Sequence, residues 1–206
     1  MNSSRDKEYR KALELARVLL VQPDLKERCR IAGATWEPAD DGGTICLPFF
    51  HHACEITIPA LQFRLRGREE LISISNQILI LHYLNGIKPI PPANKLVSFK
   101  EIPSGEFYYP AFAQRSIKPL LRVFGRNPEG FKQAAAKLGG KPAAGADVGV
   151  ILHVFPQVPV TLLFWCGDDE FPPDLTILFD ATLPEVLSTE DIAVMSQEVM
   201  LRMIRP

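Results

Sequence analysis

The sequence predicts an α+β fold with a largely antiparallel sheet and flanking helices. The first observation is three runs near the C-terminus, residues 147–155, 158–165 and 175–180, in which β-branched and aromatic residues dominate as they do in strands. The second is that short connections join these runs, whereas neighbouring parallel strands need a long helical crossover. The third is that stretches with helical spacing of apolar residues lie outside the strand runs, as is typical of α+β folds.

Two helices are expected in residues 1–34. Apolar residues at helical spacing predict a first helix that begins near the cap Ser4 and ends at Pro23. Its apolar face is expected to comprise Tyr9, Leu13, Ala16 and Leu20. A second, short helix is expected between the cap Asp24 and the stop Gly33.

The strongest interior helix is predicted over residues 68–86, with acids in its first turn and a stop at Asn85 and Gly86. Its apolar stripe is expected to comprise Leu71, Ile74, Ile78 and Leu81. The next predicted elements are a strand at 96–101 and helices at 110–124 and 128–138. A last helix is expected to begin at Ser188, where Asp191 completes a capping box. Its apolar face is formed by Ile192, Met195, Val199 and Met203.

Length and composition bound the organisation and the partners. With 206 residues and 47% hydrophobic content, the chain is expected to form one domain over 1–206, on which the helical segment 1–34 packs. A net charge of -1 predicts neither nucleic acid nor an anionic membrane surface as a partner, although a local basic patch is compatible with it. The longest apolar stretch is too short for a membrane span, and the scattered cysteines favour reduced thiols. A cytoplasmic protein is predicted.

Four residues of metal-binding type, Cys46, His51, His52 and Cys54, lie in a predicted hairpin of strands at 44–50 and 54–58. We expect Phe50 to pair with Cys54. Cys46 then lies opposite Ile58, about 13 Å along the strand from Cys54. Zinc–sulfur bonds of about 2.3 Å do not bridge that distance, so no metal site is predicted. His51 and His52 still suit an axial ligand to a macrocycle metal or an acid/base pair.

The stretch LLFWCGDDEFPPD, residues 162–174, places three carboxylates in one loop: Asp168, Asp169 and Glu170. We favour a solvated, capped turn, because a buried cluster of acids would require a raised pKa or a cation. A general acid, a cation site or a docking surface for a basic partner are the alternatives. Antiparallel neighbours place Asp174 near the loop and Asp180 at the far end of its strand, which argues against a metal cluster with Asp180.

Aromatic residues in the segment FYYPAF suggest one further site. In an irregular segment, Tyr108, Tyr109 and Phe112 would line a flat apolar ligand site together with Trp165, or would only cover the core. The sequence has no Walker loop, dinucleotide fingerprint, nucleophile elbow or zinc-protease motif. The ligand-binding candidates are therefore His51, His52, Tyr108, Tyr109, Phe112, Trp165, Asp168, Asp169 and Glu170.

Several motifs from Leu71 to the C-terminus together resemble a prokaryotic domain family of unknown function. They include ILILHYLNG, LVSFKEIPSGEFYYPAF, PLLRVFG, FPQVPVTLLFWCGDDEFPPDLTILFD and LSTEDIAV. The resemblance implies an anaerobic bacterium or archaeon, in which some similar domains are fused to an iron–sulfur module of corrinoid-protein type. It therefore implies a corrinoid or iron–sulfur protein as partner. The cofactor stays open, with a corrinoid as the candidate that the resemblance offers. This chain departs from the fused members because it has no iron–sulfur cysteine motif.

Three functions are weighed on these grounds. The leading prediction is a ligand-binding or accessory protein linked to corrinoid or redox one-carbon metabolism. The first alternative is an enzyme of hydrolase or lyase type that uses the acidic loop with His51 or His52, and it requires these groups to meet within hydrogen-bond reach. The second alternative is a protein interaction module in which the acidic loop docks a basic surface.

Overall fold

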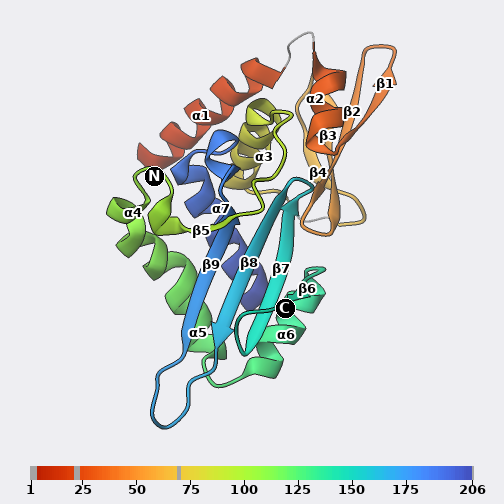
Figure 1. The fold of residues 1–206 in the computed structure, drawn as a ribbon. Coiled ribbons are helices and arrows are strands. Elements are labelled where there is room, and N and C mark those ends of the chain that lie inside the picture. Colours follow the sequence, from red (N-terminus) through yellow and green to blue (C-terminus); the bar gives the residue numbers. More distant parts are fainter. Residues whose placement is uncertain (1–3, 21–23, 69–70, 206) are drawn as a thin grey trace. The chain divides into compact units, whose positions relative to one another are not determined.

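The computed structural model describes residues 4–20, 24–68 and 71–205, and it confirms the α+β class (Figure 1). The described strands form two antiparallel sheets, one of four strands and one of five. The chain divides into two compact units. The first contains the chain up to Ile90 together with Phe155–Gln157, and the second contains the remainder. The single domain expected over 1–206 stays a prediction.

The sheet of the first unit is a meander of four strands in chain order. They are β1 (Thr35–Ala39), β2 (Gly42–Phe49), β3 (His52–Ile58) and β4 (Phe63–Leu65). Strand alternation sends Ile45, Leu47 and Ile56 into the core, while Thr44 and Glu55 lie on the other face. The predicted hairpin is β2–β3, whereas β1 and β4 were not predicted because each has at most two apolar residues in alternation.

Three helices belong to the first unit: α1 (Ser4–Leu20), α2 (Leu25–Ala32) and α3 (Ile74–Gly86). The predicted face of α1 is correct, since Leu13, Ala16 and Leu20 are buried and Tyr9 is half-buried. The backbone of Gly33 is left-handed and ends α2, as expected. The predicted stop at Pro23 lies outside the described residues.

The predicted start of α3 is wrong. The helix begins after Ser73, whose hydroxyl accepts the Asn76 N–H, so the local cap overrides the apolar pattern upstream. Leu71 therefore precedes the helix and is 88% exposed instead of belonging to the buried stripe. The acids expected in the first turn, residues 69 and 70, lie outside the described part of the chain.

Aromatic side chains pack together in the core of the first unit. Tyr83 on α3 is fully buried, and its hydroxyl donates to the Ala32 carbonyl at 2.8 Å. Its ring stacks on that of Phe155, with 4.2 Å between centroids and 4° between planes. Phe49 contacts the same ring at 5.3 Å. Phe155 therefore joins a strand and a helix of this unit.

The sheet of the second unit has the order β5-β9-β8-β7-β6. Its strands are β5 (Leu96–Ser98), β6 (Lys141–Ala143), β7 (Val148–Phe155), β8 (Val158–Trp165) and β9 (Asp174–Asp180). The three predicted C-terminal strands are confirmed as β7, β8 and β9. β5 is the predicted strand at 96–101 in shortened form, because residues 99–101 turn into a short 3-10 helix. The edge strand β6 was not predicted.

One continuous helix runs through α4 (Gly105–Phe112), a π turn (Ala113–Ile117) and α5 (Lys118–Phe124) (Figure 1). It begins five residues before the predicted Pro110, so FYYPAF is helical and not irregular. Gly105 permits this early start, because a Cβ there would lie 1.7 Å from the Phe99 carbonyl oxygen.

The other two helices of the second unit are α6 (Pro128–Lys137) and α7 (Thr189–Ile204), and a 3-10 turn (Leu183–Glu185) precedes α7. Both helices agree with the prediction. The capping box of Ser188 and Asp191 forms, and all four expected residues of α7 are buried. α7 packs against α4, α5 and α6. Phe131 of α6 stacks on Phe164 of β8 at 4.8 Å, which ties the helices to the sheet.

Candidate functional site

The predicted register of the β2–β3 hairpin is wrong. Phe49 pairs with His52, so the turn consists of Phe50 and His51 alone. Phe50 adopts the left-handed conformation, with φ 53°, that such a tight turn requires. His51 is exposed, His52 is half-buried, and their ring centroids lie 3.9 Å apart. The shorter turn shifts every pair along the strands.

The observed register changes the relation between the two hairpin cysteines. Cys46 pairs with Glu55 and Cys54 pairs with Leu47, so the two thiols lie on opposite faces of the sheet. Burial raises the pKa of Cys54 to about 12, which keeps this thiol protonated. The described residues contain no group of three histidine, cysteine or acidic side chains that could hold a metal ion.

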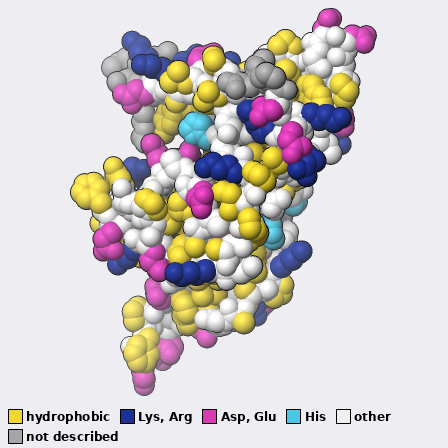
Figure 2. Space-filling model, turned by 45° about the horizontal axis from the view of Figure 1, so that its top comes forward, with side chains coloured by type: hydrophobic (Ala, Val, Ile, Leu, Met, Phe, Trp, Pro, Cys, Tyr) yellow, Lys and Arg dark blue, Asp and Glu magenta, His cyan; other side chains and the backbone are white. Residues whose placement is uncertain are grey.

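The acidic loop between β8 and β9 is a capped turn. The Asp168 carboxylate accepts the backbone N–H groups of Phe171 at 2.7 Å and Glu170 at 2.9 Å. These hydrogen bonds hold the pKa of Asp168 below its ordinary value, so this exposed group stays ionised and does not suit a general acid. The loop projects below α5 in Figure 1, and Figure 2 shows acidic and hydrophobic side chains gathered on that projection.

The structure does not bring the aromatic candidates together. Gly167 of the acidic loop donates to the Gly125 carbonyl at 2.8 Å, at the end of α5. Phe112 lies 13 residues before Gly125 on the continuous helix, which is about 20 Å at 1.5 Å per residue. Phe112 is buried and stacks on Phe99 at 4.0 Å, while Tyr109 lies under the Lys100 ammonium. The predicted flat site between the aromatic segment and Trp165 therefore does not form.

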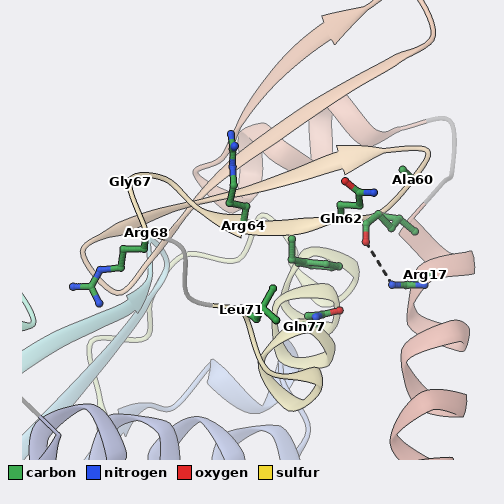
Figure 3. Close-up of a pocket in the computed structure, with 10 residues that line it drawn as sticks. Arg17, Ala60, Gln62, Arg64, Gly67, Arg68, Leu71 and Gln77 are labelled. Carbon is green, nitrogen blue, oxygen red and sulfur yellow. Dashed lines mark hydrogen bonds between the residues drawn. The ribbon is translucent and has the colours of Figure 1, made fainter.

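A cavity of about 830 Å³ lies within the first unit (Figure 3). It is bounded by α1, by the turn before β4, by the segment after β4 and by the start of α3. Its described lining comprises Arg17, Ala60, Leu61, Gln62, Phe63, Arg64, Gly67, Arg68, Leu71 and Gln77. None of these described lining residues is acidic. The lining thus combines apolar side chains, two amides and three guanidinium groups.

The cations of the cavity differ in their surroundings. In Figure 3 the side chains of Arg64 and Arg68 extend away from Leu71, whereas the Arg17 guanidinium lies beside the turn before β4. Arg64 pairs with Glu55 at 2.5 Å on the exposed face of the sheet. Arg17 is therefore the cation best placed toward the apolar part of the cavity.

Arg17 has hydrogen-bonding capacity that its neighbours do not use. Its Nη1 donates to Glu14 at 3.0 Å and its Nη2 to the Leu61 carbonyl at 3.5 Å. Its Nε is buried and has no hydrogen-bond partner among the described residues. A buried donor without a partner is rare, and it requires an explanation such as a water, an ion or a ligand that supplies the acceptor.

A tight turn presents Leu61 to this guanidinium. The N–H of Leu61 donates to the Thr57 carbonyl at 2.7 Å, and the Thr57 N–H donates to the Gln62 carbonyl at 3.1 Å. Leu61 has a φ of 50°, an uncommon conformation for a bulky residue. Backbone strain of this kind is concentrated at binding and catalytic sites.

The cavity was missed by sequence analysis because three separated segments form it. Arg17 belongs to α1, the strained turn and Arg64 lie some 45 residues later, and Gln77 belongs to α3. A partial signal exists in QFRLRGR, where arginines recur at every second position and would share one face of an extended strand, although β4 itself ends at Leu65. The pattern identifies a basic strand face, but it does not contain Arg17.

Chemically, the cavity suits a small ligand with an apolar body and one anionic group. Leu61, Phe63 and Leu71 offer apolar surface, and the Arg17 guanidinium offers charge-assisted hydrogen bonds to a carboxylate or sulfonate.

Among the described residues, no helix is both long and apolar enough to cross a membrane. A family model described as "Domain of unknown function (DUF3786)" matches residues 24–202. The match begins well before Leu71, so it includes the sheet of the first unit, which the resemblance seen in the sequence left out. Comparison with curated proteins and with solved structures finds no match.

Proposed function

Since the chain belongs to the DUF3786 family, a domain of unknown function, we propose its role from its own geometry: it is a ligand-binding accessory protein. The ligand is a small organic anion with an apolar body, and it occupies the cavity of the first unit. The observation that carries the proposal is the Arg17 guanidinium, whose buried Nε has no hydrogen-bond partner among the described residues. The other two described cations of the lining, Arg64 and Arg68, extend away from Leu71 (Figure 3).

The test uses two fluorescent probes that differ by one charge. 8-Anilinonaphthalene-1-sulfonate carries flat aromatic rings and one sulfonate, whereas N-phenyl-1-naphthylamine has the same rings without it. We expect Arg17→Gln to weaken binding of the sulfonate probe about tenfold, which is the scale of one charge-assisted hydrogen bond. Binding of the uncharged probe should change less than about twofold. Fluorescence titration measures both dissociation constants.

Arg30→Gln is the matched control. Arg30 pairs with Glu27 three residues earlier on α2, just as Arg17 pairs with Glu14 on α1, but it does not line the cavity. Both changes therefore release one exposed glutamate from its partner. Equal losses for the two variants, or equal losses of both probes in Arg17→Gln, would contradict a site at Arg17.

Leu71→Asp supplies a second test of the same cavity. It places a carboxylate on the apolar wall, so we expect both probes to bind about tenfold more weakly. Leu96→Asp is its control, because Leu96 is also an exposed leucine, at 52%, but belongs to the second unit. Unchanged binding of the uncharged probe in Leu71→Asp would place the probes elsewhere.

A finer proposal rests on the resemblance noted in the sequence. In it, the protein serves a corrinoid or redox partner of one-carbon metabolism in an anaerobe, and the exposed turn with His51 offers an imidazole to the corrinoid metal. Titration of aquocobalamin with the protein is expected to shift the visible absorption bands, and His51→Ala with His52→Ala is expected to abolish the shift. An unchanged spectrum with the parent protein would remove the corrinoid as ligand and leave the cavity proposal intact.

A further inference from the structure

The continuous helix of the second unit carries a row of cations on its exposed surface. Arg115, Lys118 and Arg122, called here the basic stripe, are exposed and follow one another at spacings of three and four residues. Residues at these spacings are neighbours on one helix face. The stripe extends about 10 Å along the helix at 1.5 Å per residue.

The three cations of the stripe have no acidic residue three or four positions away on their helix. Several exposed cations on helices pair with an acid three or four residues away, as Arg30 does with Glu27 and Lys132 with Glu129. No acidic residue occurs in the sequence between Glu106 and Glu129. Within the described part of the chain, no ion pair is formed by the three residues of the stripe.

This arrangement is unfavourable for the protein by itself. Like charges three or four residues apart repel each other and slightly destabilise a helix. The stripe contains two such pairs, Arg115 with Lys118 and Lys118 with Arg122. An anionic partner that lies along the helix relieves both repulsions at once.

Two exposed aromatic residues lie on the N-terminal part of the same helix. Phe107 is 80% exposed and Tyr108 is 53% exposed, and their rings meet edge to face at 5.1 Å. Tyr108 precedes Arg115 by seven residues on the same continuous helix. Exposed aromatics next to arginines are the composition that protein interfaces favour.

The acidic loop limits what can dock on the stripe. The loop is fixed at the end of α5 by the Gly167–Gly125 hydrogen bond and by Arg126, which donates to the Asp168 carbonyl at 3.3 Å. Its carboxylates therefore lie just past the stripe, where they repel any polyanion that continues along the helix. A long duplex or a membrane plane meets this repulsion, whereas a short acidic segment does not.

We propose that the basic stripe, with Phe107 and Tyr108, binds an acidic amphipathic helix of a protein partner. Carboxylates three or four residues apart on such a helix repeat every 5–6 Å, which is about the spacing of the cations in the stripe. Apolar residues one or two turns away on the partner helix cover the exposed aromatic pair. This interaction is independent of the cavity in the first unit.

The probe is a fluorescein-labelled, alanine-based peptide of roughly 20 residues, long enough to be helical, with glutamate at every fourth position and leucines near its ends. Fluorescence anisotropy measures its binding to the full chain. We expect Arg122→Glu and Lys118→Glu each to weaken binding at least about tenfold, because each replaces an attraction by a repulsion. Tyr108→Ala should weaken it several-fold.

Lys137→Glu is the matched control, since Lys137 is an exposed cation of α6 outside the stripe and the change in net charge is identical. It should change binding less than about twofold. The proposal is overturned if Lys137→Glu weakens binding as much as Arg122→Glu, or if a peptide with glutamine in place of glutamate binds equally well. It is also overturned if a DNA duplex or phosphatidylserine vesicles bind more tightly than the peptide and lose that binding in Arg122→Glu.

Discussion

Phe155→Ala is expected to lower the free energy of unfolding of the first unit by about 3–5 kcal/mol, the usual cost of truncating a buried aromatic residue to alanine. The ring is 1% exposed and contacts both Tyr83 and Phe49. Its loss leaves a cavity between Phe49 of β2 and Tyr83 of α3. It also removes stacking that contributes beyond the buried area.

The two tryptophans allow this effect to be measured in the right unit. Trp36 belongs to the first unit and Trp165 to the second. In a Trp165→Phe background, urea unfolding followed by Trp36 fluorescence reports the first unit. Phe155→Leu, which keeps most of the apolar volume, should cost less than about 1.5 kcal/mol.

Phe171→Ala provides the exposed control. Phe171 is 68% exposed in the acidic loop, so its truncation should change stability by less than about 0.5 kcal/mol. A loss below about 1 kcal/mol for Phe155→Ala would show that its neighbours collapse into the space, and that the ring does not hold this unit together.

Asp180→Ala is expected to lower the free energy of unfolding of the second unit by about 2–3 kcal/mol. The carboxylate ends β9 and accepts the backbone N–H groups of Ala93, Asn94 and Thr182 and the Thr182 hydroxyl, at 2.6–3.0 Å. Its removal leaves these donors without their acceptor and releases the segment that leads into β5. Unfolding followed by Trp165 fluorescence in a Trp36→Phe background measures the loss.

The same carboxylate makes stability depend on pH. Partial burial acts to raise the pKa of Asp180, but the hydrogen bonds from Thr182, Ala93 and Asn94 together outweigh it and lower the pKa below the ordinary 3.8. The folded state thus binds this proton less readily than the unfolded state. The stabilisation is present above about pH 4 and is lost as the pH falls through the lowered value.

Asp180→Asn should reduce the loss of stability at low pH, because the asparagine side chain does not titrate. Asp169→Ala is the control, since Asp169 is an exposed acid of the loop. It should leave both the stability and its pH dependence nearly unchanged. If the free energy of unfolding of Asp180→Asn falls as steeply at low pH as that of the parent protein, the pH dependence belongs to other carboxylates.

Several elements were predictable because their signals are local. The face of α7 and its capping box follow from residues within one helix, and the strands β7 to β9 follow from continuous β-rich runs. The capped acidic turn likewise depends on Asp168 and its next three residues alone. The corrinoid link, the cytoplasmic location and the enzyme alternative stay predictions.

Other features could not be predicted from local signals. The hairpin register depends on a two-residue turn in which Phe50 has a left-handed backbone conformation. Phenylalanine rarely adopts this conformation, so its residue type does not predict it. α3 begins at Ser73 because one cap prevails over an apolar pattern that continues upstream. The short strands β1, β4 and β6 exist only because a neighbouring strand offers hydrogen bonds.

By itself, the sequence determined the α+β class, the faces of α1 and α7 and the antiparallel C-terminal strands, because alternation and helical spacing encode burial residue by residue. It also contained the basic stripe, as an acid-free stretch with cations at helical spacing. Only the tertiary structure decided the cavity at Arg17 and the separation of the aromatic candidates from Trp165. Both depend on which distant segments contact each other. Packing and hydrogen bonds between segments decide these contacts, and no single stretch of sequence predicts them.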